Sequence, residues 1–166
     1  MSRTLALPYA ALMYARDHAL IATPIGPILI EGDTTSLLRI HLGAEGSPRS
    51  GDTVAVREAS DQLRAYFSGD LKMFDLPLPA IASPRGRVLR DGLIALRYGE
   101  TASYGALARR LGSGPRAIGQ LCARNPFPIV VPCHRVLGAG GALGSYSAGE
   151  GPATKQWLLE HEQRHL

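Results

Sequence analysis

The stretch that decides the fold reads Asn125-Pro126-Phe127-Pro128-Ile129-Val130-Val131-Pro132-Cys133-His134-Arg135-Val136. Its apolar residues 129–131 predict a short buried strand or extended segment, which Pro132 ends. His134 and Arg135 directly follow Cys133, and both basic side chains favour the thiolate form of a cysteine. A helical turn that starts at Cys133 would lower the pKa of its thiol further. The stretch therefore predicts a reactive cysteine on a turn that follows a buried segment.

His134 is the obvious base for the Cys133 thiol, although adjacent residues in a helix do not face each other. We therefore expect a water molecule to relay the proton from the thiol to the imidazole. A third group must then orient the imidazole ring. Glu160 and Glu162, near the C-terminus, are both candidates, and spacing alone does not choose between them.

The other cysteine, Cys122, lies beside Leu121 in a predicted helix, and we expect it to be an inert packing residue. A chain of 166 residues with only two cysteines is typical of a reducing compartment. Adjacent Cys and His side chains rarely chelate one ion, and no second Cys or His pair has ligand spacing. We therefore expect neither a metal nor a cofactor.

Upstream of this stretch the sequence predicts two helices joined by a glycine turn. A helix over residues 87–96 comes first, and Thr101 or Ser103 can cap the next one. Residues 112–115, Gly-Ser-Gly-Pro, form a tight turn that places a proline at the start of a helix over residues 116–124. This order indicates a helix-turn-helix, although an ordinary αα-hairpin has the same pattern.

Residues 84–135 carry nine arginines against Asp91 and Glu100. Such a local excess of positive charge attracts a polyanion such as DNA. On charge alone, a surface that binds DNA and an ordinary solvated, arginine-rich surface explain the pattern equally well.

The first part of the chain predicts a small β-rich unit. Three short apolar runs, separated by turn residues, predict strands over residues 19–22, 28–30 and 37–42. Residues 56–67 have helical periodicity, and the proline-rich residues 71–84 predict an extended linker. The apolar fraction of 45% is enough for a core. No run approaches the ~20 apolar residues of a membrane span, and no signal peptide is evident, so we expect a soluble, cytoplasmic protein.

Residues 125–136 resemble the signature of the O6-alkylguanine-DNA alkyltransferases. Other blocks are similar to that family at residues 23–27, 62–69, 99–104, 116–119, 144–147 and 155–162. The resemblance implies an α+β fold. A small N-terminal β-rich, ribonuclease H-like domain (residues 1–82) would precede a mostly helical C-terminal domain (residues 83–166) that carries the helix-turn-helix.

The same resemblance implies direct-reversal DNA repair. Cys133 would take the alkyl group from O6-alkylguanine, and from O4-alkylthymine, in a flipped base of duplex DNA, and each molecule would act once. His134 would draw off the thiol proton through water. The terminal Leu-Leu-x-His-Glu block selects Glu162 over Glu160 as the residue that orients His134, and Asn125 would brace the turn.

The resemblance also implies contacts with DNA, which the family approaches through the minor groove. Arg116 would replace the flipped nucleotide, and Tyr104 would press against the neighbouring phosphate and hydrogen-bond the flipped base. The backbone around Cys133, Val136 and Ser147 would read the guanine edge. Further expected contacts with the substrate or DNA are Ser103, Arg135 and Tyr146. We expect a monomer that binds no membrane and, in a bacterium, associates with the nucleoid.

Three other functions compete with this interpretation. A lesion-binding relative that flips the base without transfer lacks the cysteine that is present here. A cysteine hydrolase would need direct contact between adjacent side chains and an oxyanion-hole motif, which the sequence does not show. A transcriptional helix-turn-helix module would not need Pro-Cys-His-Arg at residues 132–135.

Overall fold

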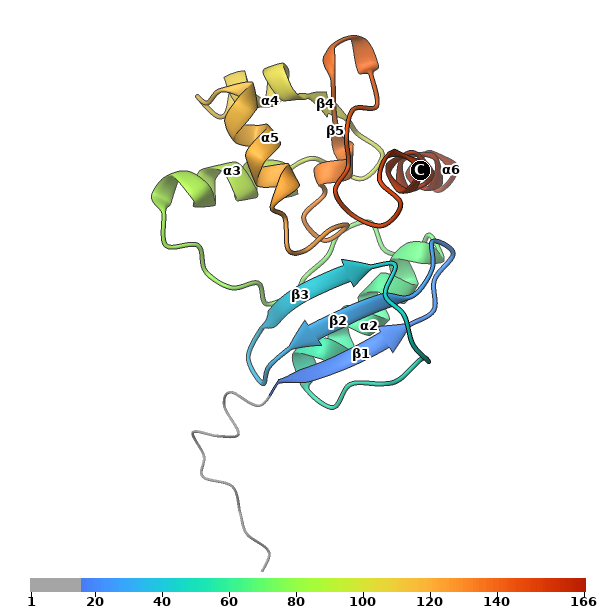
Figure 1. The fold of residues 1–166 in the computed structure, drawn as a ribbon. Helices are drawn as coiled ribbons and strands as arrows, with labels where there is room; N and C mark the ends of the chain where they lie inside the picture. Colours follow the sequence, from blue (N-terminus) through green and yellow to red (C-terminus); the bar gives the residue numbers. More distant parts are fainter. Residues whose placement is uncertain (1–15) are drawn as a thin grey trace, which may run out of the picture.

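The computed structural model describes residues 16–166; residues 1–15 of the predicted first domain lie outside the described part. Its N-terminal half is an antiparallel sheet in the order β1-β2-β3, with one helix packed against it (Figure 1). The elements of this half are β1 (Asp17–Ile21), β2 (Ile28–Gly32), β3 (Leu37–Leu42) and α2 (Val54–Phe67). The predicted β-rich unit is therefore confirmed.

Helix α2 forms where the sequence predicts it, because its cap and its apolar face agree. The Thr53 hydroxyl accepts a hydrogen bond from the Val56 amide and caps the first turn. Val56, Ala59, Leu63 and Tyr66 recur at helical spacing and are fully buried. This face covers β1 and β2.

The C-terminal half is mostly helical, as predicted, and sits above the sheet in Figure 1. Its elements are α3 (Pro84–Ile94), β4 (Ala102–Ser103), α4 (Tyr104–Arg110), α5 (Pro115–Ala123), the 3₁₀ turn η1 (Cys133–Arg135), β5 (Val136–Leu137), the 3₁₀ turn η2 (Ala139–Gly141) and α6 (Pro152–Arg164). One cluster of buried apolar side chains continues from the sheet into these helices. Along residues 16–166, no helix has the length and apolar content to cross a membrane.

Helices α4 and α5 form the predicted helix-turn-helix. Of the two candidate caps, the structure uses Ser103, whose hydroxyl accepts a hydrogen bond from the Ala106 amide at 3.0 Å. Gly112 takes a φ of +59°, which glycine adopts without the steric cost of a Cβ atom. Pro115 then starts α5.

The segment before the cysteine differs from the prediction. Residues 129–131 are buried, but they lie in a tight turn rather than in a strand. Ile129 has a φ of +76°, which is uncommon for a β-branched residue. The turn is closed by a hydrogen bond from the Val131 amide to the Phe127 carbonyl at 2.9 Å. Apolar composition predicted the burial of this segment, while tertiary packing set its path.

The N-terminal half supports this turn directly. The Ile40 amide of β3 donates a hydrogen bond to the Pro126 carbonyl at 2.9 Å. The sheet edge is therefore joined to the stretch that carries Cys133.

Candidate active site

A cavity of about 540 Å³ opens between the helix-turn-helix and the loop that precedes α6. Its walls include Cys133 and four of the residues expected at the substrate or DNA, namely Tyr104, Arg116, Tyr146 and Ser147. Cys133 itself is only 3% exposed. The cavity thus gathers residues from α4, α5, η1 and the loop after η2 around one sulfur atom.

Asn125 holds the turn through three side-chain hydrogen bonds, an arrangement consistent with the role that the family resemblance implies for it. Its side-chain amide donates hydrogen bonds to the Val131 carbonyl at 2.8 Å and to the Cys133 sulfur at 3.1 Å. Its oxygen accepts a hydrogen bond from the Phe127 amide at 2.9 Å.

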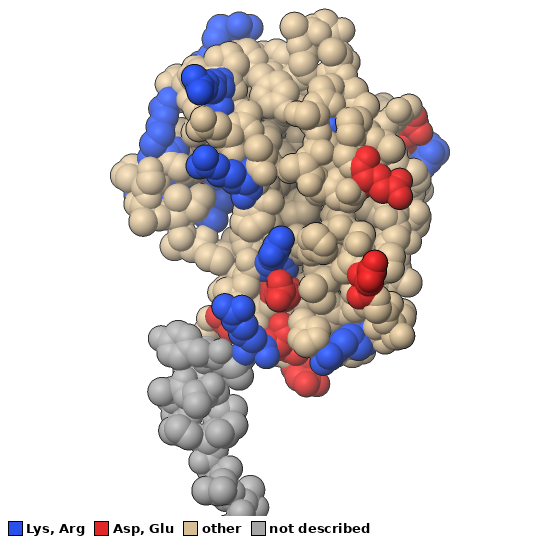
Figure 2. All heavy atoms as spheres, viewed as in Figure 1, with Lys and Arg blue, Asp and Glu red and all other residues tan. Residues whose placement is uncertain are grey.

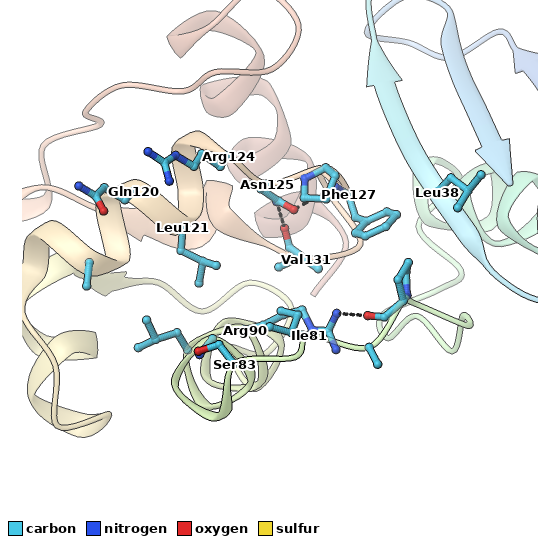
Figure 3. Close-up of a pocket in the computed structure, with 16 residues that line it drawn as sticks. Leu38, Ile81, Ser83, Arg90, Gln120, Leu121, Arg124, Asn125, Phe127 and Val131 are labelled. Atoms are coloured by element: carbon cyan, nitrogen blue, oxygen red, sulfur yellow. Dashed lines mark hydrogen bonds between the residues drawn. The ribbon is translucent and has the colours of Figure 1, made fainter.

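Figure 3 shows Asn125 beside Val131, next to a separate, mainly apolar cavity of about 630 Å³ between β3, α3 and α5. That second cavity does not include Cys133 in its walls.

The surroundings of Cys133 favour its thiolate. A hydrogen bond with the Cys122 thiol is the largest influence that lowers the pKa of Cys133, and burial opposes it. The Asn125 amide and the positive charge of Lys155 lower the pKa of Cys133 as well. The expected inert role of Cys122 is therefore incomplete, because this buried residue also touches the nucleophile.

Behind the turn, His134 pairs with Glu162 and not with Glu160. His134 Nε2 lies 2.7 Å from Glu162 Oε1, and both side chains are buried. Glu160 is exposed and accepts a hydrogen bond from Gln156. Burial lowers the pKa of His134, so the imidazole is neutral. Nδ1 of His134 is buried and has no hydrogen-bond partner among the described residues.

Arg135 was expected to contact DNA, but its side chain lies in the interior of the protein. It is 5% exposed, and its Nε and Nη2 donate hydrogen bonds to the Glu162 carboxylate at 2.9–3.2 Å. Its Nη1 donates to the Leu96 carbonyl at 2.6 Å. A guanidinium held in this way cannot reach a phosphate, so the expectation is corrected: Arg135 holds Glu162.

Sequence reasoning missed two further partners of Glu162. The Tyr66 hydroxyl donates to Glu162 Oε1 at 2.9 Å, and the Gly99 amide donates to Oε2 at 3.0 Å. Burial would raise the pKa of Glu162, but hydrogen bonds from His134 and Arg135 and the positive charge of Arg135 hold it well below its usual range. Tyr66 reads as a core residue in the sequence, and no local signal links it to a residue so distant in the chain.

Lys155 is a further residue without an assigned role in the sequence. Its ammonium is fully buried and donates hydrogen bonds to the Val136 carbonyl at 2.7 Å and to the Ser145 carbonyl at 3.3 Å. Lys155 lies about one helical turn before Leu158 and about two turns before Glu162, so it is on the same buried face of α6. Helical spacing alone could have indicated this position. Val136 is buried behind the cavity, and its carbonyl is already engaged by Lys155.

Replacing Tyr66 with phenylalanine is expected to lower the free energy of unfolding by about 1.5–3 kcal/mol, the contribution of a hydrogen bond to a charged group. Urea denaturation measures this change. Tyr98→Phe is the matched control, because the Tyr98 hydroxyl is buried near Tyr66 and has no partner among the described residues. An equal loss in both variants would contradict a specific contribution of the bond to Glu162.

Positive charge gathers over the helical half of the surface. Figure 2 shows Lys and Arg side chains concentrated on the part formed by α3, α4 and α5, while most visible acidic side chains lie on other parts of this face. The exposed arginines of these helices and their ends are Arg85, Arg87, Arg109, Arg110, Arg116 and Arg124. The arrangement suits a polyanion bound beside the cavity. In the described part of the chain, no group of three or more His, Cys, Asp or Glu residues could hold a metal ion.

The fold and the site together define a class of protein: a DNA-binding helix-turn-helix unit that carries an activated cysteine in a cavity. Two family models match the chain. The 6-O-methylguanine DNA methyltransferase ribonuclease-like domain matches residues 17–80, and the DNA binding domain of the same family matches residues 86–164. The chain belongs to the 6-O-methylguanine DNA methyltransferase family.

Individual relatives are similar to this chain over most of its length and most of theirs. The chain is 39% identical over 153 residues to a methylated-DNA–protein-cysteine methyltransferase of Methanosarcina acetivorans, covering 87% of this chain and 97% of the relative. It is 37% identical to the Mycobacterium tuberculosis protein of that name, covering 86% and 90%. The crystal structure of Mycobacterium tuberculosis OGT in complex with DNA superposes with a TM-score of 0.76 at 37% identity, covering 89% and 93%.

Proposed function

We propose that this chain repairs DNA by direct reversal, transferring the alkyl group of O6-alkylguanine, and of O4-alkylthymine, to Cys133. The observation that carries the proposal is the Cys133 sulfur, which faces a cavity beside a basic helix-turn-helix and is backed by the His134–Glu162 pair. The sulfur attacks the alkyl carbon, the carbon–oxygen bond breaks, and the base keeps the electron pair. The thioether does not hydrolyse, so each molecule acts once.

The proton of the Cys133 thiol passes through one water molecule to His134 Nδ1. Because Glu162 is ionised, His134 Nε2 carries the hydrogen of their 2.7 Å bond, and this leaves Nδ1 as the free base. Glu162 then stabilises the imidazolium as it forms. Arg135 and Tyr66 are positioning residues, since both hold the Glu162 carboxylate.

The target base must leave the duplex, because a sulfur atom cannot reach an alkyl group within the stack. Arg116 is exposed at the start of α5 and lines the cavity, so it fills the gap from the minor-groove side.

Tyr104 presses on the neighbouring phosphate and hydrogen-bonds the base. The backbone at Cys133 and Ser147 reads the guanine edge, together with the second lone pair of the Val136 carbonyl, and Tyr146 closes the cavity wall. Ser103 and the amides of the helix-turn-helix contact phosphates.

The protein acts as a monomer in the cytoplasm, near the nucleoid in a bacterium. Residues 1–82 and 83–166 are its two domains. The proposed division is supported by the separate sheet and helical halves.

Intact-mass measurement tests the proposed reaction. Incubation with a duplex that contains O6-methylguanine is expected to add one methyl group per protein molecule, with no further gain on excess DNA. Binding of the duplex without any gain in mass would instead identify a lesion-binding protein. Repeated turnover of an ester would identify a hydrolase.

Arg116→Ala is expected to slow transfer from duplex DNA by about tenfold or more, a loss of about 1.4 kcal/mol in transition-state stabilisation. Transfer from free O6-benzylguanine should keep its rate, since no base needs to be flipped. Arg124→Ala is the matched control, because it removes the same charge from the opposite end of α5, outside this cavity. Equal losses on duplex and free base would remove Arg116 from the flipping role.

A further inference from the structure

The two cysteines of this chain meet at the cavity. Cys122 comes from α5 and Cys133 from η1, and both line the cavity of about 540 Å³. Both are free thiols. On the wall of this cavity each cysteine is the largest influence on the pKa of the other, so the two thiols are close neighbours.

This proximity makes the two sulfurs chemically unequal. The hydrogen bond lowers the pKa of Cys133, and the same bond, together with burial, raises the pKa of Cys122. Cys133 is therefore the thiolate that reacts first, and Cys122 is a protonated thiol held beside it. Redox-active cysteines commonly have this arrangement of a low-pKa sulfur next to a resolving sulfur.

We propose that Cys122 and Cys133 form a peroxide-reactive dithiol that closes reversibly to a disulfide and withholds Cys133 from alkyl groups while it is closed. The co-reactant is a hydroperoxide. Its effect on repair rests on the proposed function, whereas the dithiol chemistry does not.

The reaction takes two steps. The Cys133 thiolate attacks one peroxide oxygen, the oxygen–oxygen bond breaks, hydroxide leaves, and Cys133 becomes a sulfenic acid. The Cys122 sulfur then attacks the Cys133 sulfur, the sulfur–oxygen bond breaks, and water leaves with the thiol proton. The two cysteines lose two electrons in total, and the peroxide gains them.

Cys122 has a protective effect in this scheme. A sulfenic acid without a neighbouring thiol oxidises further to sulfinic and sulfonic acids, which ordinary thiols do not reduce. A protein that uses its nucleophile once cannot recover from that loss. The disulfide keeps Cys133 recoverable.

The test treats the reduced protein with hydrogen peroxide in the absence of DNA and measures its intact mass. We expect the wild-type protein to lose two hydrogen atoms and to regain them with dithiothreitol. Cys122→Ser, which keeps a hydrogen-bond donor but has no resolving sulfur, should instead gain oxygen atoms that dithiothreitol does not remove. Cys122→Ala should behave like Cys122→Ser.

Methyl acceptance from an O6-methylguanine duplex is then measured on the same samples. The oxidised wild-type protein should lose nearly all acceptance and recover it on reduction, whereas oxidised Cys122→Ser should not recover. Oxygen gain by the wild-type protein, no reaction with peroxide, or a disulfide between two molecules would each overturn the proposal. Because the disulfide is detected without DNA, its failure is distinct from failure of alkyl transfer.

Discussion

Cys133→Ala is expected to abolish methyl transfer while the protein still binds a duplex that contains O6-methylguanine. The variant loses the sulfur that accepts the alkyl group and keeps Cys122 on the wall of the same cavity. Cys122 does not substitute for it, because burial raises the pKa of Cys122 and a protonated thiol does not displace a base from an alkyl carbon, which is a much weaker electrophile than a sulfenic acid.

Intact mass after incubation with the methylated duplex measures transfer, and fluorescence polarisation with the same duplex measures binding. The expected result is an unchanged mass together with retained binding. A methyl group found on Cys122 of the variant would show that position in the cavity, rather than the ionisation of one thiol, selects the acceptor.

Glu162→Gln is expected to slow alkyl transfer by about 100-fold to 10,000-fold, the range that positioned proton transfer contributes. Glutamine keeps an oxygen for His134 Nε2 but loses the negative charge that stabilises the imidazolium. It also leaves the Arg135 guanidinium buried without its carboxylate, a change that typically costs about 3–5 kcal/mol of stability. A large kinetic effect and a large loss of stability therefore meet in one residue.

Single-turnover rates with O6-benzylguanine separate the two effects, provided that circular dichroism shows the variant to be folded. Glu160→Gln is the matched control, since Glu160 lies on the exposed side of the same helix. Should Glu162→Gln not fold, Glu162→Asp keeps the charge and withdraws the carboxylate from His134, so it should also slow transfer. Folded variants that react at the wild-type rate would exclude the His134–Glu162 pair from the reaction.

Local patterns were sufficient for much of this molecule. A cap at Thr101 or Ser103, together with Gly112 and Pro115, predicted the boundaries of the helix-turn-helix, because caps and turns depend on neighbouring residues alone. The apolar faces of the strands and of α2 could be predicted for the same reason. The sequence also singles out Cys133 as the reactive cysteine, but the groups that lower the pKa of its thiol are Cys122, Asn125 and Lys155, not the adjacent His134 and Arg135.

Contacts between residues that are distant in the chain could not be predicted from local patterns. Spacing left Glu160 and Glu162 equal, and family resemblance, not helical geometry, favoured Glu162. Tyr66 looked like a core residue and Arg135 like a surface arginine, yet both hold Glu162 in the interior.

The chain's local chemistry thus determined which elements form, since caps, turns and periodicity act over a few residues. The partners of the Cys133 sulfur and of Glu162 were decided by packing. Burial removes water from these side chains, and a buried charge or polar atom must then bond to whatever group the fold brings beside it, however remote in the chain. Cys122 shows the same principle, because its thiol acquires a role only where α5 passes beside η1.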